Sequence, residues 1–144
     1  MPDKDLWTCP DCGNTFVTAN MWHSCGRFSL DALFTRSEPQ VLDLYRQFED
    51  LVRSLGQIKV IPQKTRISFQ AQVRFIGVYP RKQYFLAGFW LKKKLEGARF
   101  RKIEQFGAHD FVHLVEIRSP DDLDAWLLSL IREAFQVGER RHMR

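Results

Sequence analysis

The sequence predicts an α+β fold, in which an antiparallel sheet of about five strands is flanked by two helices and preceded by a small zinc knuckle. Three observations predict this fold. All three cysteines lie within the first 25 residues. Two later segments have the apolar period of helices, and the stretch between them alternates apolar and polar side chains as half-buried strands do. The chain therefore divides into a knuckle over residues 1–30 and an α+β domain over residues 31–144.

The knuckle has the spacing Cys-x2-Cys-x10-His-x-Cys, formed by Cys9, Cys12, His23 and Cys25. Thiolate and imidazole ligands in a set of four suit the tetrahedral coordination that Zn²⁺ adopts. Because four protein ligands leave no position open for water, we expect one structural Zn²⁺ ion. The segment resembles the front of a Cys2His2 zinc finger, except that Cys25 stands where such a finger has its first histidine.

Other interpretations of the cysteines remain open. Cys9 and Cys12 could be a redox pair, although no βαβ pattern surrounds them, or they could be unrelated free thiols. His23 stands two residues before Cys25, a spacing that does not suit one face of a regular helix, so a turn is expected there. The fourth ligand could also come from elsewhere in the chain: His109, His113 or His142.

The first helix is expected over residues 37–55. Ser37 is the predicted N-cap, with Gln40 completing a capping box, and Gly56 ends the helix. The second helix is expected to begin near Ser119, where a cap residue is followed by a proline and two acids, and to end before Gly138.

Between the helices the period changes to two residues. Residues 66–75 alternate strictly, so they form either one long strand or a hairpin with a tight turn at Gln70-Ala-Gln72. Further strands are expected over residues 73–79, 84–91 and 111–118. Helices covering the apolar face of this sheet would leave its polar face open.

The net charge of +5 is concentrated in one segment. Residues 53–102 carry 13 basic side chains and one acidic, Glu96, whereas both flanking segments are acidic. We call residues 53–102 the basic block. Its cations fall on or between the predicted strands, and those expected to bind an anion are Lys64, Arg66, Arg74, Arg81, Lys82, Lys92, Lys93, Lys94, Arg99, Arg101 and Lys102.

A basic sheet face suits a phosphate backbone, because arginine bonds phosphate through two N–H groups and aromatic rings stack on bases. The sequence therefore predicts binding of a polyanion, DNA or RNA in the first place. One alternative is an ordinary solvated or partner-facing surface. Another is a protein–protein adaptor whose knuckle contacts the partner, which fits the acidic segment 1–52 equally well.

A second group of residues is Lys64 and Arg66 together with His109 and His113. If residues 109–117 are extended, both histidines share one strand face, either as core residues or as part of a pocket for a small anion. An enzyme built on these residues is a further alternative. Because no known catalytic motif occurs and the basic block is almost free of carboxylates, the sequence favours a protein that is not an enzyme.

Several short motifs carry a resemblance to a known family: Trp7-Thr-Cys-Pro-Asp-Cys-Gly13, Trp22-His-Ser-Cys-Gly26, Pro62-Gln-Lys-Thr-Arg-Ile-Ser-Phe69 and Val137-Gly-Glu-Arg140. With them the chain resembles an uncharacterised bacterial family, known only as a domain of unknown function, over nearly its whole length. The order of elements is also distantly similar to that of the small YdhG-like α+β proteins. Neither resemblance implies an established activity.

No apolar run is long enough to span a bilayer, and the N-terminus lacks the apolar stretch of a signal peptide. We therefore expect a cytoplasmic protein without membrane association.

Overall fold

The computed structural model describes residues 6–8, 15–16 and 29–140, and in this part of the chain it confirms the predicted α+β fold. The elements in chain order are β1 (Trp7–Thr8), β2 (Thr15–Phe16), α1 (Leu30–Leu33), α2 (Pro39–Arg53), β3 (Lys59–Pro62), β4 (Ile67–Gln70), β5 (Arg74–Pro80), β6 (Phe85–Leu91), β7 (Phe100–Gly107), β8 (Asp110–Ile117), a 3-10 helix over Pro120–Asp122, and α3 (Ala125–Gly138). No helix among these residues is long and apolar enough to cross a bilayer.

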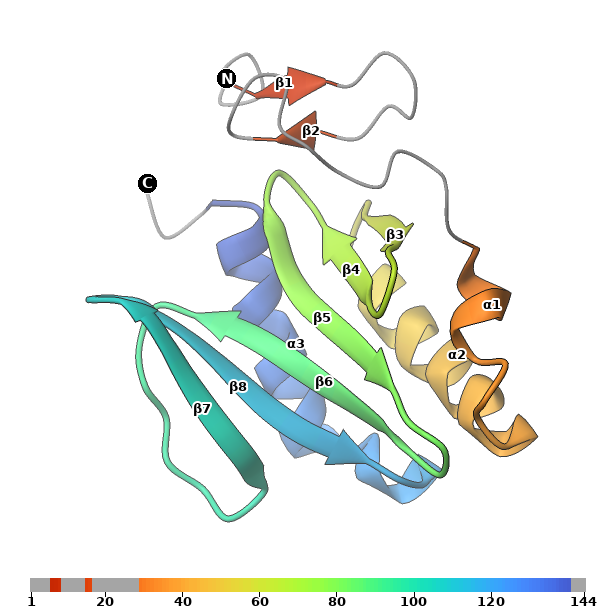
Figure 1. The fold of residues 1–144 in the computed structure, drawn as a ribbon. Helices are drawn as coiled ribbons and strands as arrows, with labels where there is room; N and C mark the ends of the chain where they lie inside the picture. The colour runs from red at the N-terminus through yellow and green to blue at the C-terminus, as the bar shows by residue number, and fades with distance from the viewer. Residues whose placement is uncertain (1–5, 9–14, 17–28, 141–144) are drawn as a thin grey trace.

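The main sheet has six strands in the order β3-β4-β5-β6-β8-β7, and every neighbouring pair is antiparallel. Both long helices, α2 and α3, lie behind the sheet in Figure 1, so they cover the same face. We call this the helix face and the other the open face. The stretches expected by residue number form β4, β5, β6 and β8, and the edge strands β3 and β7 bring the count to six, against about five expected.

Aromatic side chains fill the space between the helices and the sheet. The ring of Phe48 from α2 lies 5.8 Å from that of Phe69 on β4 and 5.4 Å from that of Phe85 on β6. At the other helix, the ring of Phe135 lies 5.6 Å from that of Phe75 on β5. This single core holds the sheet as one rigid support for its open face.

Helix α2 confirms the first predicted helix but not its predicted cap. The N-cap is Glu38, and the hydroxyl of Ser37 instead donates to the carbonyl of Arg81, at 2.6 Å. The N–H of Glu38 donates to the carbonyl of Lys82, at 2.8 Å. The start of α2 is therefore fixed by the turn between β5 and β6 rather than by a local capping box.

The second predicted helix is divided in two. Ser119 is the N-cap of the short 3-10 helix, and its N–H donates to the carboxylate of Asp122, at 3.3 Å; α3 then begins separately with Asp124 as its N-cap. The alternating stretch 66–75 is a hairpin, because β4 ends at Gln70 and β5 begins at Arg74. The carbonyl of Gly138, at the end of α3, accepts from the N–H groups of Gln72 and Val73 in the hairpin turn, at 2.8 and 3.0 Å.

The predicted zinc ligands Cys9, Cys12, His23 and Cys25 lie outside the described residues. Of the segment around them, the structure describes the pairing of β1 with β2, in which Trp7 lies opposite Phe16 and Thr8 opposite Thr15. The division at residue 30 stays a prediction.

Candidate functional site

The open face is set by the register of the strands. Ser68, Gly77, Gly88 and Leu114 lie in one row across four strands and share this face. The rows beside it, which include Phe89 on β6, point to the helix face and enter the core. The open face therefore carries the side chains that the two helices do not cover.

Many cations of the basic block are ion-paired with carboxylates from the C-terminal third of the chain. The pairs are Lys92 with Asp110, Lys93 with Glu133, Arg99 with Asp124, Arg101 with Glu116, and Lys102 with Glu104. Strands β7 and β8 bring most of these acids beside the block, so the charge of residues 53–102 is not spread over one continuous basic face. Lys94, also predicted to bind an anion, is exposed in the loop after β6.

A cationic groove, which we call the turn groove, lies where three connecting segments meet. It is lined by Arg36 from the α1–α2 connection, by Lys64 from the β3–β4 turn, and by Arg81 and Lys82 from the β5–β6 turn. Its volume is about 410 Å³, and the residues lining it include the hydroxyl side chains of Thr35, Ser37 and Thr65 but no carboxylate. All four cations are exposed, and none makes an ion pair with a described carboxylate.

Backbone contacts fix the walls of the turn groove. The N–H of Gln63 donates to the carbonyl of Arg66, at 2.8 Å, and closes the β3–β4 turn. The bonds from Ser37 and Glu38 to the β5–β6 turn join the other two segments. Hydrogen bonds from Gln40 and Gln83 and, to a smaller extent, the charge of Lys82 lower the pKa of the Glu38 carboxyl, which does not line the groove.

A second cavity, the sheet-face pocket, lies on the open face and has a volume of about 110 Å³. Its floor includes Gly77 and Gly88, which are paired directly across β5 and β6. A Cβ atom at Gly88 would lie 3.0 Å from Cγ1 of Val112 and 3.1 Å from Cδ2 of Leu114. The absence of a side chain at Gly88 therefore leaves space in the pocket above the sheet.

Two arginines and a tyrosine form one side of the sheet-face pocket. The guanidinium of Arg66 donates through Nε to Oε1 of Gln63, at 2.8 Å, and lies 3.4 Å from the hydroxyl of Tyr79. Arg74 also lines the pocket. Burial lowers the pKa of the Arg74 guanidinium, and the charge of Arg66 lowers that pKa further.

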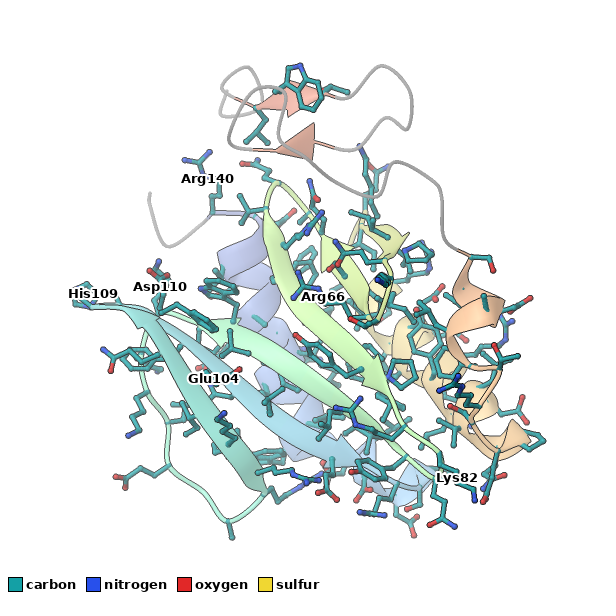
Figure 2. All side chains as sticks on the ribbon, viewed as in Figure 1. Arg66, Lys82, Glu104, His109, Asp110 and Arg140 are labelled. Atoms are coloured by element: carbon teal, nitrogen blue, oxygen red, sulfur yellow. The ribbon has the colours of Figure 1, made fainter. Side chains whose placement is uncertain are left out.

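Aromatic rings and a carboxylate form the other side. Trp90 and Phe106 stack with their ring centroids 5.7 Å apart and their planes at 21°. The indole N–H of Trp90 donates to Asp110, at 3.2 Å, while the Phe106 side chain is 62% exposed. Glu104 completes this side. Figure 2 shows Glu104 on β7 and Arg66 at the start of β4, with β5, β6 and β8 between them.

The two predicted pocket histidines lie apart from each other and from Lys64 and Arg66. His113 is fully buried on the helix face, where its Nε2 accepts from the N–H of Leu95, at 3.0 Å. His109 is exposed in the turn before β8, at the tip of the β7–β8 hairpin in Figure 2 and far from Arg66. The structure therefore does not assemble the proposed anion pocket of Lys64, Arg66, His109 and His113.

Sequence reasoning missed residues in both cavities. Arg36 lies outside the basic block and joins the turn groove only through the fold. The sheet-face pocket joins Trp90, Glu104 and Phe106 to Arg66 across the sheet. No alternation in the sequence marks the Phe106 ring as exposed, because Gln105 and Phe106 are consecutive exposed residues of β7.

Comparison with known proteins gives one match. No curated protein and no solved structure matches the chain, so the distant similarity to YdhG-like proteins stays a resemblance in the order of elements. A family model described as "Domain of unknown function (DUF5655)" matches residues 30–138, which include both cavities and the whole six-stranded sheet. The chain belongs to the DUF5655 family.

Proposed function

We propose that this DUF5655 protein binds the phosphate backbone of nucleic acid through the turn groove. The proposal rests on one observation: four cations from three separate segments line one groove, and no described carboxylate lines it with them. Clustering like charges is unfavourable unless solvent or an anion compensates it. Elsewhere in the basic block the fold places carboxylates beside the cations, as it does for Arg99 with Asp124, at 2.9 Å.

The chemistry of the groove suits phosphate. Arg36 and Arg81 can each offer two parallel N–H donors, Lys64 and Lys82 are mobile point charges, and the threonine and serine hydroxyls nearby are further donors. The four cations are exposed, so they can reach a backbone that passes over the groove. Binding of this kind is electrostatic and independent of sequence, and it weakens steeply with added salt because the release of counterions then contributes less free energy.

The test is a charge reversal, Lys64→Glu with Lys82→Glu, measured with labelled 20-nucleotide DNA and RNA strands at several salt concentrations. We expect the double variant to lose at least about tenfold in affinity at roughly 50 mM salt. The slope of log affinity against log salt should become shallower by about 0.7 for each phosphate of the single strand that the variant no longer neutralises.

The matched control is Lys94→Glu with Arg132→Glu, which changes the net charge by the same amount at exposed positions outside the groove. This control should keep most of the affinity and the native salt slope. Equal losses in the two double variants would reduce the effect to net charge, and a native protein that binds neither nucleic acid at low salt would end the proposal.

We further propose that Cys9, Cys12, His23 and Cys25 hold one structural Zn²⁺ ion. The ligand types and spacing support it. So does the antiparallel pairing of β1 with β2, because Cys9 and Cys12 both fall in the connection between these two strands, the position that a metal-binding turn occupies. Two strands of two residues each bury too little surface to be stable alone, so a bound ion would supply most of the local stability.

Elemental analysis of the purified protein should find about one zinc per chain. The double variant Cys9→Ser with Cys12→Ser should lose that zinc, while its α+β domain keeps the native far-ultraviolet circular dichroism. Zinc that persists at the same stoichiometry in the double variant would assign the ion to other residues.

A further inference from the structure

The residues that line the sheet-face pocket adjoin, along two segments of the chain, residues that line the turn groove. Lys64 and Thr65 line the groove and Arg66 lines the pocket; on the neighbouring hairpin, Arg81 lines the groove and Tyr79 the pocket. A nucleic-acid strand whose backbone crosses the groove can therefore extend along these two protein segments to the pocket. We propose that the sheet-face pocket holds one unpaired guanine nucleotide, an inference that rests on the proposed nucleic-acid binding.

The arginine side of the pocket fits the phosphate of this nucleotide. Arg66 has neutral hydrogen-bond partners, Gln63 and Tyr79, and makes no ion pair with a described carboxylate. Arg74 lies close enough for the charge of Arg66 to lower its pKa. Arg66 and Arg74 both line the pocket, so a phosphate on this side would accept hydrogen bonds from the Arg66 guanidinium and lie in the field of both positive charges.

The centre of the pocket fits a single flat ring system. At about 110 Å³ the sheet-face pocket is smaller than the enclosed cavity of about 150 Å³ that holds benzene, so a base would enter it only in part and lie mostly across its open side. Phe106 is largely exposed and is backed by Trp90, which gives a base a ready stacking surface. The low floor at Gly77 and Gly88 leaves room beside these rings.

The far side of the pocket selects the base. Glu104 has one ion-pair partner among the described residues, Lys102 at 3.3 Å, and both side chains are partly exposed, so the pair is weak and easily exchanged. A carboxylate accepts two parallel N–H bonds. The guanine edge offers two adjacent N–H donors, whereas adenine and cytosine each offer one amino group beside an acceptor.

The size of the site separates a nucleotide from smaller anions. Arg66 precedes β4 and Glu104 lies on β7, four strand spacings apart, or roughly 19 Å between backbones. Both side chains line the same pocket, so a ligand that meets both must carry its anion and its donors at opposite ends. Inorganic phosphate, whose oxygens all surround one atom, does not offer these two separate ends.

The experiment compares the pentanucleotides TTGTT and TTTTT, with GMP, AMP and inorganic phosphate as further probes. The native protein should bind TTGTT at least about tenfold more tightly than TTTTT. Glu104→Gln should abolish that preference and leave the affinity for TTTTT unchanged, whereas Glu96→Gln, in the exposed loop after β6, should change neither. Phe106→Ala should weaken binding of TTGTT by about tenfold, since it removes the stacking surface.

The variants and ligands of this experiment distinguish the guanine site from the proposed nucleic-acid binding by the groove. Lys64→Glu with Lys82→Glu should weaken both pentanucleotides equally and keep their ratio. The native protein could prefer GMP over AMP and lose this preference in Glu104→Gln, yet bind TTGTT no more tightly than GMP. That result would support the guanine site in the pocket and contradict nucleic-acid binding by the groove. Two results would overturn the guanine assignment. The first is that the native protein binds TTGTT and TTTTT equally and also binds GMP and AMP equally. The second is a preference for guanine that persists in Glu104→Gln. Unfolding midpoints of all variants should match that of the native protein.

Discussion

Replacing His113 by alanine should lower the free energy of unfolding by about 3 kcal/mol. The side chain is fully buried, its Nε2 accepts the N–H of Leu95, at 3.0 Å, and its ring lies 5.0 Å from that of Phe100. The alanine variant leaves the Leu95 N–H without its acceptor and creates a cavity beside Phe100. Urea unfolding measures the change, and His109→Ala, at an exposed position, should stay within about 0.5 kcal/mol of the native protein.

The same histidine should make stability depend on pH. Burial lowers the pKa of His113 below the 6.5 that it has in the unfolded chain. As the pH falls below 6.5, the unfolded state takes up the proton first, so the free energy of unfolding falls by up to about 1.4 kcal/mol per pH unit. His113→Gln, which keeps an acceptor but does not titrate, should lack this contribution between pH 7 and 5. An identical slope in the variant would place the titration on another group.

How much of the fold the sequence predicts depends on where each strand lies. Strands β4, β5, β6 and β8 lie inside the sheet and bury one or both faces, so their apolar pattern is strong. Strand β7 lies at the edge, and none of its residues is fully buried. Selection for burial leaves little pattern in such a strand, which explains why the sequence analysis assigns no residues to β7.

The charge pattern shows a different limit. A block of cations along the chain predicts a basic face only if no acids fold back onto it. Strand β8 lies between β6 and β7 and places Asp110 and Glu116 beside Lys92 and Arg101. Conversely, Arg36 comes from outside the block and completes the turn groove. Since both effects depend on strand order, sequence distance could not predict them.

The alternation of apolar and polar residues predicts which face of the sheet a side chain occupies, but it does not predict where a strand gives way to a turn. It places His113 on the same face as Val115, and both are buried on the helix face as expected for core residues. It fails for His109, because β8 begins at Asp110 and the turn before it carries His109 into solvent. The sheet-face pocket could not be predicted at all, since the pairing of Gly77 with Gly88 is a matter of register between two strands.

Replacing Gly138 by alanine should destabilise the fold by about 3 kcal/mol, although alanine is the better helix former by about 1 kcal/mol in an exposed helix. A Cβ atom there would lie 2.3 Å from Cδ1 and 2.7 Å from Cγ of Phe75. The contact is with the base of a buried ring that also packs against Phe135, so the ring has little freedom to move aside.

The clash would also reach the β4–β5 turn, because the Gly138 carbonyl holds the N–H groups of Gln72 and Val73. Thermal and urea unfolding measure the loss, and Gly97→Ala, where the new Cβ would make an ordinary 3.4 Å contact, should be nearly neutral. In a double-mutant cycle, Phe75→Leu should recover part of the loss caused by Gly138→Ala. A Gly138→Ala variant more stable than the native protein would mean that Phe75 yields and helix propensity decides, in which case the end of α3 does not anchor the hairpin.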